Sequence, residues 1–228
     1  MLIAEDLLLL LTDDASGRLM VSGAEVDIAL GGANLLELAL ANRVDLTREG
    51  DEARPGRLVV RDATPTGDEV LDRALEVVVA RQGKKPTAAI GPLGKNLRQT
   101  LYVRLAAIGA VRAEQGTILG IFPRHAWPAA DARHEAEVRE AMTRALLEET
   151  APDPRTAALI SLVHALRSEH RVVDPRDAGL SKRELRERAA RIARGSWASD
   201  AVRRAVDEMM AAIIAATAAA SAATSATS

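Results

Sequence analysis

A cluster of basic side chains near the middle of the sequence could hold a phosphate group. Its members are Lys84, Lys85, Lys95 and Arg98, and Arg104 follows them. In a helix that includes residues 93–108, Lys95 and Arg98 stand three positions apart and project from one face. Such a pair could bind phosphate through charge-assisted hydrogen bonds. A solvated helix face that binds nothing in particular is the alternative interpretation.

An apolar stretch predicts a β-hairpin over residues 110–122, with its tip at residues 115–117. It concentrates large apolar side chains in a chain whose aromatic content is only 2%. These side chains are Ile118, Leu119, Ile121 and Phe122, followed by Trp127. An apolar tip of this kind inserts into a membrane interface or packs on a partner. The alternative is that the hairpin folds back onto the core of its own chain.

The residue types that enzymes use most are not arranged for catalysis. The chain has no cysteine, which excludes thiolate metal sites and cysteine nucleophiles. Its four histidines lack the spacing of metal ligands, and surface or capping roles explain them better. The sequence also lacks a nucleophile elbow, a Walker loop and a dinucleotide-binding glycine motif. We therefore predict a protein that is not an enzyme and that uses no metal and no cofactor.

A second basic segment, residues 182–194, resembles a helix that could read a nucleic-acid groove. Glu184 and Glu187 interleave with its basic residues, which favours a solvated, salt-bridged helix face. The chain has a formal net charge of −2, whereas a domain that covers nucleic acid is usually basic. The sequence therefore predicts no nucleic-acid partner.

These candidate residues must be positioned by helices, because apolar residues recur at helical spacing through most of the chain. One helix is predicted to be entered through Gly31-Gly32, and another to begin at a capping box of Thr66 and Glu69 and to end near Ala80. The other predicted helices span residues 2–12, 93–108, 131–150, 153–168 and 181–194, and a last one begins near Ser196. Residues 49–56 are predicted to be an exposed loop and residues 58–60 a strand.

The 228 residues are 48% hydrophobic and 27% charged, as in an ordinary globular protein. Because neither a repeat nor a long linker is present, we predict a mainly α fold, a single helical-bundle domain over residues 1–210 with a small apolar β-hairpin. Residues 211–228, rich in Ala, Ser and Thr, are predicted to be a helix end followed by disorder. No stretch suits a signal peptide or a membrane span, so we expect a cytoplasmic protein.

Three motifs carry a family resemblance. They are Glu5-Asp6-Leu7-Leu8-Leu9, then Leu35-x-Glu37-Leu38-Ala39-Leu40-x-x-Arg43-Val44, and then Pro65-Thr66-Gly67-Asp68-x-x-Leu71-Asp72-x-Ala74-Leu75. Together they resemble the Golgi phosphoprotein 3 family, and the resemblance extends more loosely to about Leu166. It implies a mostly helical domain with an apolar hairpin that contacts membrane and can mediate self-association.

The resemblance also implies a lipid site, because eukaryotic members of that family bind phosphatidylinositol 4-phosphate on Golgi membranes. The Arg-x-x-Arg pair of their lipid pocket corresponds here to Lys95 and Arg98. Two further pocket residues of the family, a tryptophan and an arginine, correspond to positions near Ser22 and Gly31. We therefore expect a shallow phosphate site in this chain rather than a pocket for one headgroup.

From these arguments we predict a non-catalytic bacterial protein that is peripherally associated with the cytoplasmic face of a membrane. Its expected partner is an anionic phospholipid or a phosphoinositide, held by Lys95 and Arg98 with added attraction from Lys84 and Lys85. The predicted hairpin enters the membrane or forms a homo-oligomer. The alternative from a different class is a protein–protein adaptor or helical regulator that oligomerises through the hairpin without binding lipid.

Overall fold

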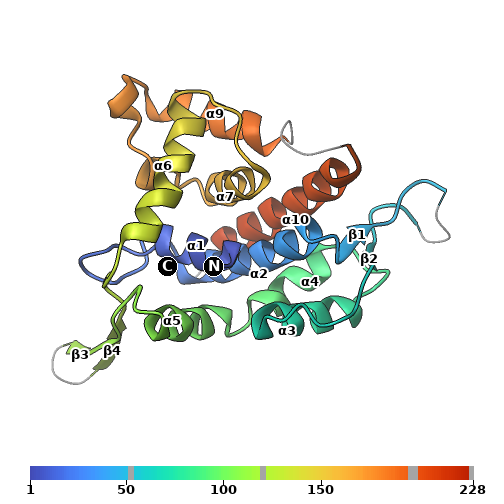
Figure 1. The fold of residues 1–228 in the computed structure, drawn as a ribbon, viewed down its shortest axis with the longest axis horizontal. Coiled ribbons are helices and arrows are strands. Elements are labelled where there is room, and N and C mark those ends of the chain that lie inside the picture. Colours follow the sequence, from blue (N-terminus) through green and yellow to red (C-terminus); the bar gives the residue numbers. More distant parts are fainter. Residues whose placement is uncertain (51–53, 119–121, 195–199, 226–228) are drawn as a thin grey trace.

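The computed structural model describes residues 1–50, 54–118, 122–194 and 200–225. Most of these residues are helical, which confirms the predicted mainly α class (Figure 1). The helices are α1 (Ile3–Leu10), α2 (Gly23–Leu40), α3 (Glu69–Val79), α4 (Thr87–Gly94), α5 (Leu97–Ala107), α6 (Arg133–Leu147), α7 (Pro154–Ala165), α8 (Glu169–Val172), α9 (Lys182–Ala193) and α10 (Asp200–Ser225), with a 3-10 turn at Pro175–Ala178.

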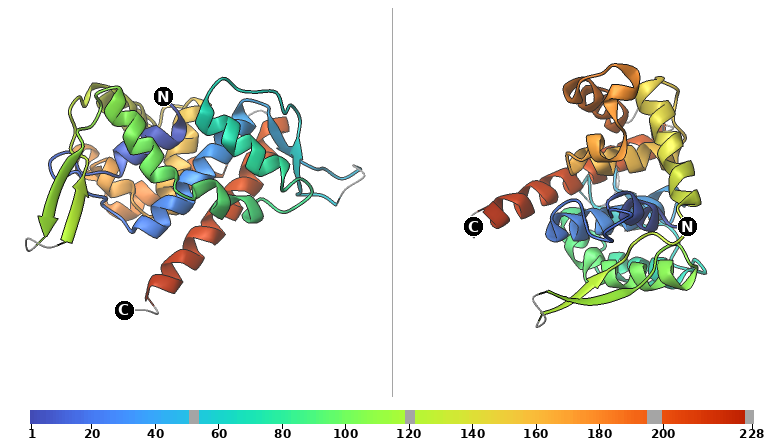
Figure 2. Two further views of the ribbon diagram at one scale, coloured as in Figure 1. Left: turned by 90° about the horizontal axis from the view of Figure 1, so that it is seen from below. Right: turned by 90° about the vertical axis from the view of Figure 1, so that its left-hand side faces the viewer.

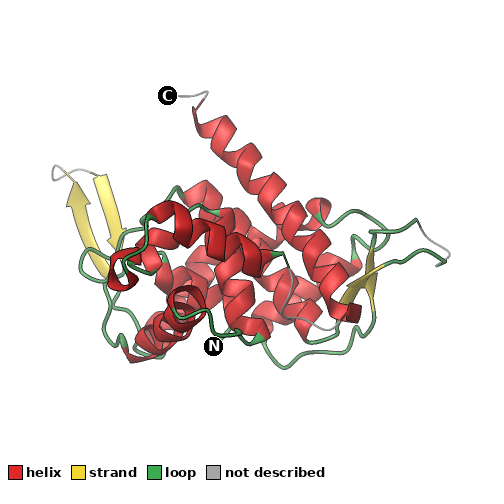
Figure 3. Cartoon of the chain, turned by 90° about the horizontal axis from the view of Figure 1, so that it is seen from above, coloured by secondary structure: helices red, strands yellow, loops and turns green. Residues whose placement is uncertain are grey.

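Two pairs of short antiparallel strands complete the described part of the chain. The first pair joins β1 (Val44–Leu46) to β2 (Leu58–Val60), as expected for residues 58–60. The second joins β3 (Glu114–Ile118) to β4 (Phe122–Ala126). The two pairs lie at opposite ends of the helical body (Figure 3).

Helix α2 lies in the centre of the bundle because its sequence is apolar on almost every side. Helices α1, α4, α5, α7 and α10 pack around it. Helices α3 and α5 lie on one side of the molecule, and α6, α7 and α9 lie on the other (Figure 1). This arrangement buries leucine, isoleucine, valine and alanine in one continuous core.

The two glycines that we expected at the entry of a helix lie instead in the middle of α2. A Cβ atom on Gly31 would meet the backbone oxygen of Ile90 in α4 at 2.2 Å, so α4 crosses α2 in direct backbone contact. Gly32 faces a different helix, because a Cβ there would lie 2.6 Å from the side chain of Ile213 in α10. The glycine pair therefore allows two helices to approach the central one closely.

Several predicted helix boundaries are confirmed by their caps. Asp153 accepts hydrogen bonds from the first turn of α7, and Ser181 forms the expected capping box with Glu184 at the start of α9. The capping box predicted at the start of α3 is wrong, because Asp68 caps that helix and Thr66 binds Asp72 instead. An aspartate in that position satisfies the same free N–H groups.

The predicted helix over residues 93–108 is also wrong, because the chain forms two helices there. Helix α4 ends at Gly94, Lys95 is extended, and Asn96 adopts a left-handed conformation with φ of 60°. Asparagine tolerates this conformation better than most residues, so α5 starts in a new direction at Leu97.

The hairpin and the tail differ from their predicted boundaries. The hairpin runs from Glu114 to Ala126, so the tip predicted at residues 115–117 is wrong and those residues belong to β3. Helix α10 continues through Ser225, and Thr217 is still buried against the bundle. The helical part of residues 211–228 is thus longer than its low hydrophobicity suggests, and residues 226–228 lie outside the described part.

Candidate functional site

A long stretch between α3 and the hairpin contains no acidic residue. From Val77 to Ala113 it carries seven basic residues, in a chain whose net charge is −2. They are Arg81, Lys84, Lys85, Lys95, Arg98, Arg104 and Arg112. The stretch includes α4 and α5, which lie with α3 and the hairpin on one side of the molecule (Figures 1 and 2). The stretch is therefore a local concentration of positive charge, next to an α3 that carries Glu69, Asp72 and Glu76.

Lys95 and Arg98 do not share a helix face as the sequence suggested. Lys95 follows the last residue of α4, and Arg98 lies in the first turn of α5. The helix break between them turns their side chains into different surroundings. The prediction that Lys95 and Arg98 project from one helix face is therefore wrong, although both residues remain on this side of the protein.

Arg98 is engaged with α2. Its Nε lies 3.2 Å from Oδ1 of Asp27, and its guanidinium lies directly against Gly23. Burial raises the pKa of Asp27, and the charge of Arg98 opposes that rise. The side chains of Arg98 and Asp27 are 36% and 39% exposed. Asp27 therefore partly neutralises Arg98, but the guanidinium still contacts solvent.

The three lysines Lys84, Lys85 and Lys95 are exposed, and we call them the lysine surface. In the described ranges, none of the three side chains forms a hydrogen bond or an ion pair. Lys84 and Lys85 precede α4 and Lys95 follows it. Arg104, by contrast, is fully engaged, because its guanidinium binds Glu5 at 2.9 Å and Asp68 at 2.7 Å. Within the stretch from Val77 to Ala113, the lysines are thus the cations most available to a ligand.

The structure explains why an arginine is absent at position 31. A side chain on Gly31 would collide with α4, and a Cβ on the facing Gly94 would lie 2.0 Å from the backbone oxygen of Asp27. Gly23 lies against the guanidinium of Arg98 without a side chain, and the residue before it is the small Ser22. The chain therefore lacks the space and the side chains for an enclosed headgroup pocket at this place.

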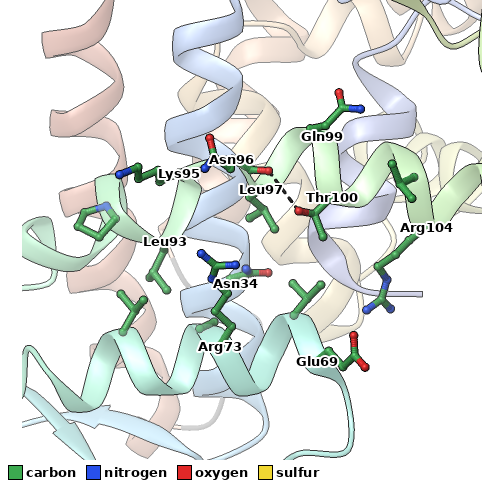
Figure 4. Close-up of a pocket in the computed structure, with 15 residues that line it drawn as sticks. Asn34, Glu69, Arg73, Leu93, Lys95, Asn96, Leu97, Gln99, Thr100 and Arg104 are labelled. Atoms are coloured by element: carbon green, nitrogen blue, oxygen red, sulfur yellow. Dashed lines mark hydrogen bonds between the residues drawn. The ribbon is translucent and has the colours of Figure 1, made fainter.

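A groove lies beside the lysine surface and was not predicted from the sequence. Its volume is about 520 Å³, and it is formed by α3, the α4–α5 junction and one residue of α2 (Figure 4). Lys95 is part of its rim, and Asn34 of α2 and Arg73 of α3 contribute polar groups. The sequence separation of Asn34 and Arg73 gives no sign that they are neighbours. They come together only because α3 packs on α2.

The hairpin projects from the helical body, as its sequence predicted (Figure 2). The backbone of Ile118 pairs with that of Phe122 at the outer end of the two strands. Leu119 and Ile121 lie outside the described residues. Trp127 is not part of an exposed apolar tip, because it is buried and stacks on Tyr102 with ring centroids 4.9 Å apart.

The basic segment at residues 182–194 forms the salt-bridged helix that the sequence favoured. Arg183 pairs with Glu187 four residues later, and Arg188 binds Glu149 and the carbonyl groups that end α6. These contacts lie on the side of the molecule away from α4 and α5 (Figure 1). They fix α9 to α6 and leave α9 with a solvated face of mixed charge.

The described residues include no cluster of three or more acidic or histidine side chains that could hold a metal ion. Two histidines have structural partners instead. Nε2 of His134 lies 2.8 Å from Asp6, and Nδ1 of His164 lies 2.6 Å from Glu169. These two histidines thus bind buried carboxylates, which is neither the capping role nor the free surface role that the sequence predicted.

The acidic residues of the first motif hold the helices together. Glu5 and Asp6 are only 3% and 1% exposed. Glu5 accepts a hydrogen bond from the N–H of Leu2 and binds Arg104 of α5. Asp6 binds Arg155 of α7 at 2.8 Å. The two carboxylates therefore connect α1 to helices on both sides of the molecule.

The second and third motifs have the same kind of role. Glu37 binds the backbone N–H of Ile3 and the guanidinium of Arg155. Arg43 donates hydrogen bonds to the carbonyl oxygens of Thr64 and Pro65, which fixes the segment that leads into α3. The charged residues of the motifs thus stabilise the fold, and the lysine surface lies outside them.

Within the ranges that the structure describes, no helix is both long and apolar enough to cross a membrane. A comparison with protein-family models matched residues 3–209 to the Golgi phosphoprotein 3 (GPP34) model. Curated protein sequences gave no match to the chain. The family match covers all three motifs, the lysine surface, the groove and the hairpin.

Proposed function

The chain belongs to the Golgi phosphoprotein 3 family, and we propose that it binds the surface of anionic membranes and carries out no reaction there. The observation that supports this proposal most strongly is the stretch from Val77 to Ala113, with its seven basic residues and no acidic one. It includes the three exposed lysines that have no partner within the described residues. A lysine near an anionic bilayer contributes about 1 kcal/mol to binding.

We propose that the phosphate groups are held by the field of the lysine surface and not by an enclosed pocket. Arg98 is already paired with Asp27, and Gly31 lies in a helix crossing that leaves no room for a ligand. Exposed charges that act through solvent recognise charge density more than headgroup structure. The proposed ligand is therefore any anionic phospholipid, including a phosphoinositide.

The hairpin supplies the apolar part of the proposed contact. It projects on the same side of the molecule as α3 and α5 (Figure 2). Ile118 and Phe122 pair at its outer end, and Leu119 and Ile121 belong to the connection between them by sequence. Apolar insertion and lysine attraction would then act together, as two weak signals commonly do at membrane surfaces.

Replacing Lys84, Lys85 and Lys95 with Gln is expected to weaken binding to phosphatidylglycerol-containing vesicles about a hundredfold. The estimate combines about 1 kcal/mol for each lysine with tenfold in affinity for each 1.4 kcal/mol. Vesicle sedimentation at two salt concentrations measures the effect, and the wild-type protein should bind less at the higher one.

The matched control for this prediction removes three charges from the other side of the molecule. Lys182, Arg183 and Arg191 lie on α9 and are exposed, so their replacement with Gln should change binding little. Equal binding of the wild-type protein to phosphatidylglycerol vesicles and to pure phosphatidylcholine vesicles would contradict the proposal.

Replacing both Leu119 and Phe122 with Asp is expected to abolish vesicle binding and to leave the helical circular dichroism signal unchanged. A carboxylate is costly to bury in lipid, whereas a projecting hairpin contributes little to the core. Sedimentation velocity without lipid tests self-association in the same variant. A variant that loses oligomers but still binds vesicles would favour the adaptor over the membrane-binding protein.

A further inference from the structure

The groove beside the lysine surface has the size of a small-molecule site. Its volume of about 520 Å³ lies within the range of about 300–1,000 Å³ that is typical of ligand pockets. Ser22, Gly31 and Arg98 do not line it, but Lys95 does, so the groove adjoins the place where the family resemblance put a headgroup and shares one cation with it. Its walls come from α3 and α5, and its floor is α2 (Figure 4).

The floor of the groove contains an unsatisfied polar atom. Asn34 is only 2% exposed, and its Oδ1 accepts no hydrogen bond. It is the one buried side-chain oxygen or nitrogen without a partner among the described residues. A buried acceptor in this state is unfavourable, because water would have satisfied it in the unfolded chain. A hydroxyl donor that reaches this atom, which itself has almost no contact with solvent, would remove this cost.

The wall of the groove contains a free cation. Arg73 reaches from α3 toward Asn34 (Figure 4). None of the described residues forms an ion pair or a hydrogen bond with its guanidinium. Arg104 at the far end of the groove is bound to Glu5 and Asp68, and Lys95 points away from Asn34. Arg73 is therefore the cation that is available to an anionic group inside the groove.

The remaining walls are mixed: Glu69, Asn96, Gln99 and Thr100 are polar, and the other lining residues are apolar. Val70, Ala74 and Leu93 are nearly buried under the groove, and Val103 is 55% exposed at its edge. An exposed valine next to a cavity loses contact with water when an apolar chain covers it, which is favourable. The groove thus joins an anion site, a hydroxyl acceptor and an apolar track.

From these three features we propose that the groove binds a single-chain amphiphile with an anionic group and a neighbouring hydroxyl. The anionic oxygens accept hydrogen bonds from Arg73, the hydroxyl donates to Oδ1 of Asn34, and the chain lies along Val70 and Val103. Both a 3-hydroxy fatty acid and a monoacyl glycerol phosphate carry this chemistry. The site does not depend on the proposed membrane binding, because it would work on a dissolved monomeric ligand.

Isothermal titration calorimetry without vesicles tests this proposal. The probes are 3-hydroxydecanoate, decanoate and 1,3-decanediol, each below the concentration at which it forms micelles. We expect decanoate to bind about tenfold more weakly than 3-hydroxydecanoate, and the uncharged diol more weakly still. Monodecanoyl glycerol phosphate, compared with 3-hydroxydecanoate, shows whether phosphate or carboxylate is the preferred anion.

Two substitutions assign the contacts. Arg73→Gln should weaken 3-hydroxydecanoate binding at least tenfold, whereas Arg176→Gln, at an exposed position on the other side, should not. Asn34→Leu should remove the preference for the hydroxyl and should also raise the thermal midpoint, because it removes an unsatisfied buried acceptor. A variant that is folded and more stable but has lost this discrimination cannot be explained by misfolding.

Equal affinity for decanoate and 3-hydroxydecanoate would overturn the proposal, as would the absence of saturable binding by any of the probes. So would an Asn34→Leu variant that keeps the hydroxyl preference. Vesicle binding by the lysine surface is measured separately. Its loss would overturn the proposed function and leave the groove as a site for soluble amphiphiles.

Discussion

Replacing Arg155 with Ala is expected to lower the free energy of unfolding by about 3 kcal/mol, because it leaves buried carboxylates without their cation. The guanidinium of Arg155 lies 2.8 Å from Asp6 and 3.0 Å from Glu37. The Asp6 side chain is completely buried, so water cannot replace the lost guanidinium, and among the described residues only Nε2 of His134 remains beside the carboxylate. Chemical denaturation at pH 7 measures the change.

The control for this prediction is an arginine whose ion pair lies on the surface. Arg133 pairs with Asp131 at 2.5 Å, closer than either contact of Arg155, but its side chain is 88% exposed. Arg133→Ala should leave the unfolding midpoint almost unchanged, because solvent screens such a pair. If the two variants lost equal stability, burial would not be the cause of the effect.

The cost of Arg155→Ala should also depend on pH. Burial raises the pKa of Glu37, and the Ile3 N–H and Arg155 oppose the rise, so removing Arg155 raises it further. A carboxyl whose pKa is raised by folding binds its proton more tightly in the folded protein than in the unfolded chain. The protein therefore loses stability as the pH rises from the unfolded-state pKa of this group through its folded-state pKa. The difference in unfolding free energy between Arg155→Ala and the wild-type protein should therefore shrink as the pH falls from 7 toward 4.5, the ordinary pKa of Glu.

Replacing Gly31 with Ala is expected to destabilise the fold by about 3 kcal/mol, although alanine is the better helix former. The new Cβ would lie 2.2 Å from the backbone oxygen of Ile90, and backbone atoms in a helix crossing cannot move aside easily. Thermal unfolding followed by circular dichroism measures the loss.

Gly91 provides the matched control for that substitution. It lies in α4, the same helix that crosses Gly31, but a Cβ there would meet nothing within 4 Å. Gly91→Ala should cost far less than Gly31→Ala, because its methyl group meets no neighbouring helix; the clash of a Cβ-bearing residue with the Pro92 ring offsets the gain in helix propensity. A stable Gly31→Ala variant would show that α2 and α4 separate more easily than their contact suggests.

The helices could be predicted from the sequence where periodicity and caps agree. Asp153-Pro154 and Ser181-x-x-Glu184 mark the starts of α7 and α9 correctly. Gly31 and Gly32 were misplaced because a glycine pair signals a turn locally, and only the neighbouring helices show that it serves close packing. The break before α5 had a local signal in Gly94 and Asn96, which are both residues that commonly end helices.

The candidate site could be predicted in composition but not in geometry. The sequence identified the lysines, and the structure leaves them exposed. It did not indicate that Arg98 is paired with Asp27, since those residues are far apart in the chain. Asn34 and Arg73 carried no signal at all, because a groove is formed by tertiary packing and has no sequence period.

The separation between the motif residues and the lysine surface has a consequence for how the ligand preference of this chain can change. Glu5, Asp6 and Glu37 are tied to the folding energy, so substitutions there are penalised whatever the protein binds. The lysines contribute nothing comparable to the core, so they can be exchanged one at a time without loss of fold. The same scaffold could thus be directed to a new ligand by surface substitutions alone, with no compensating change in its interior.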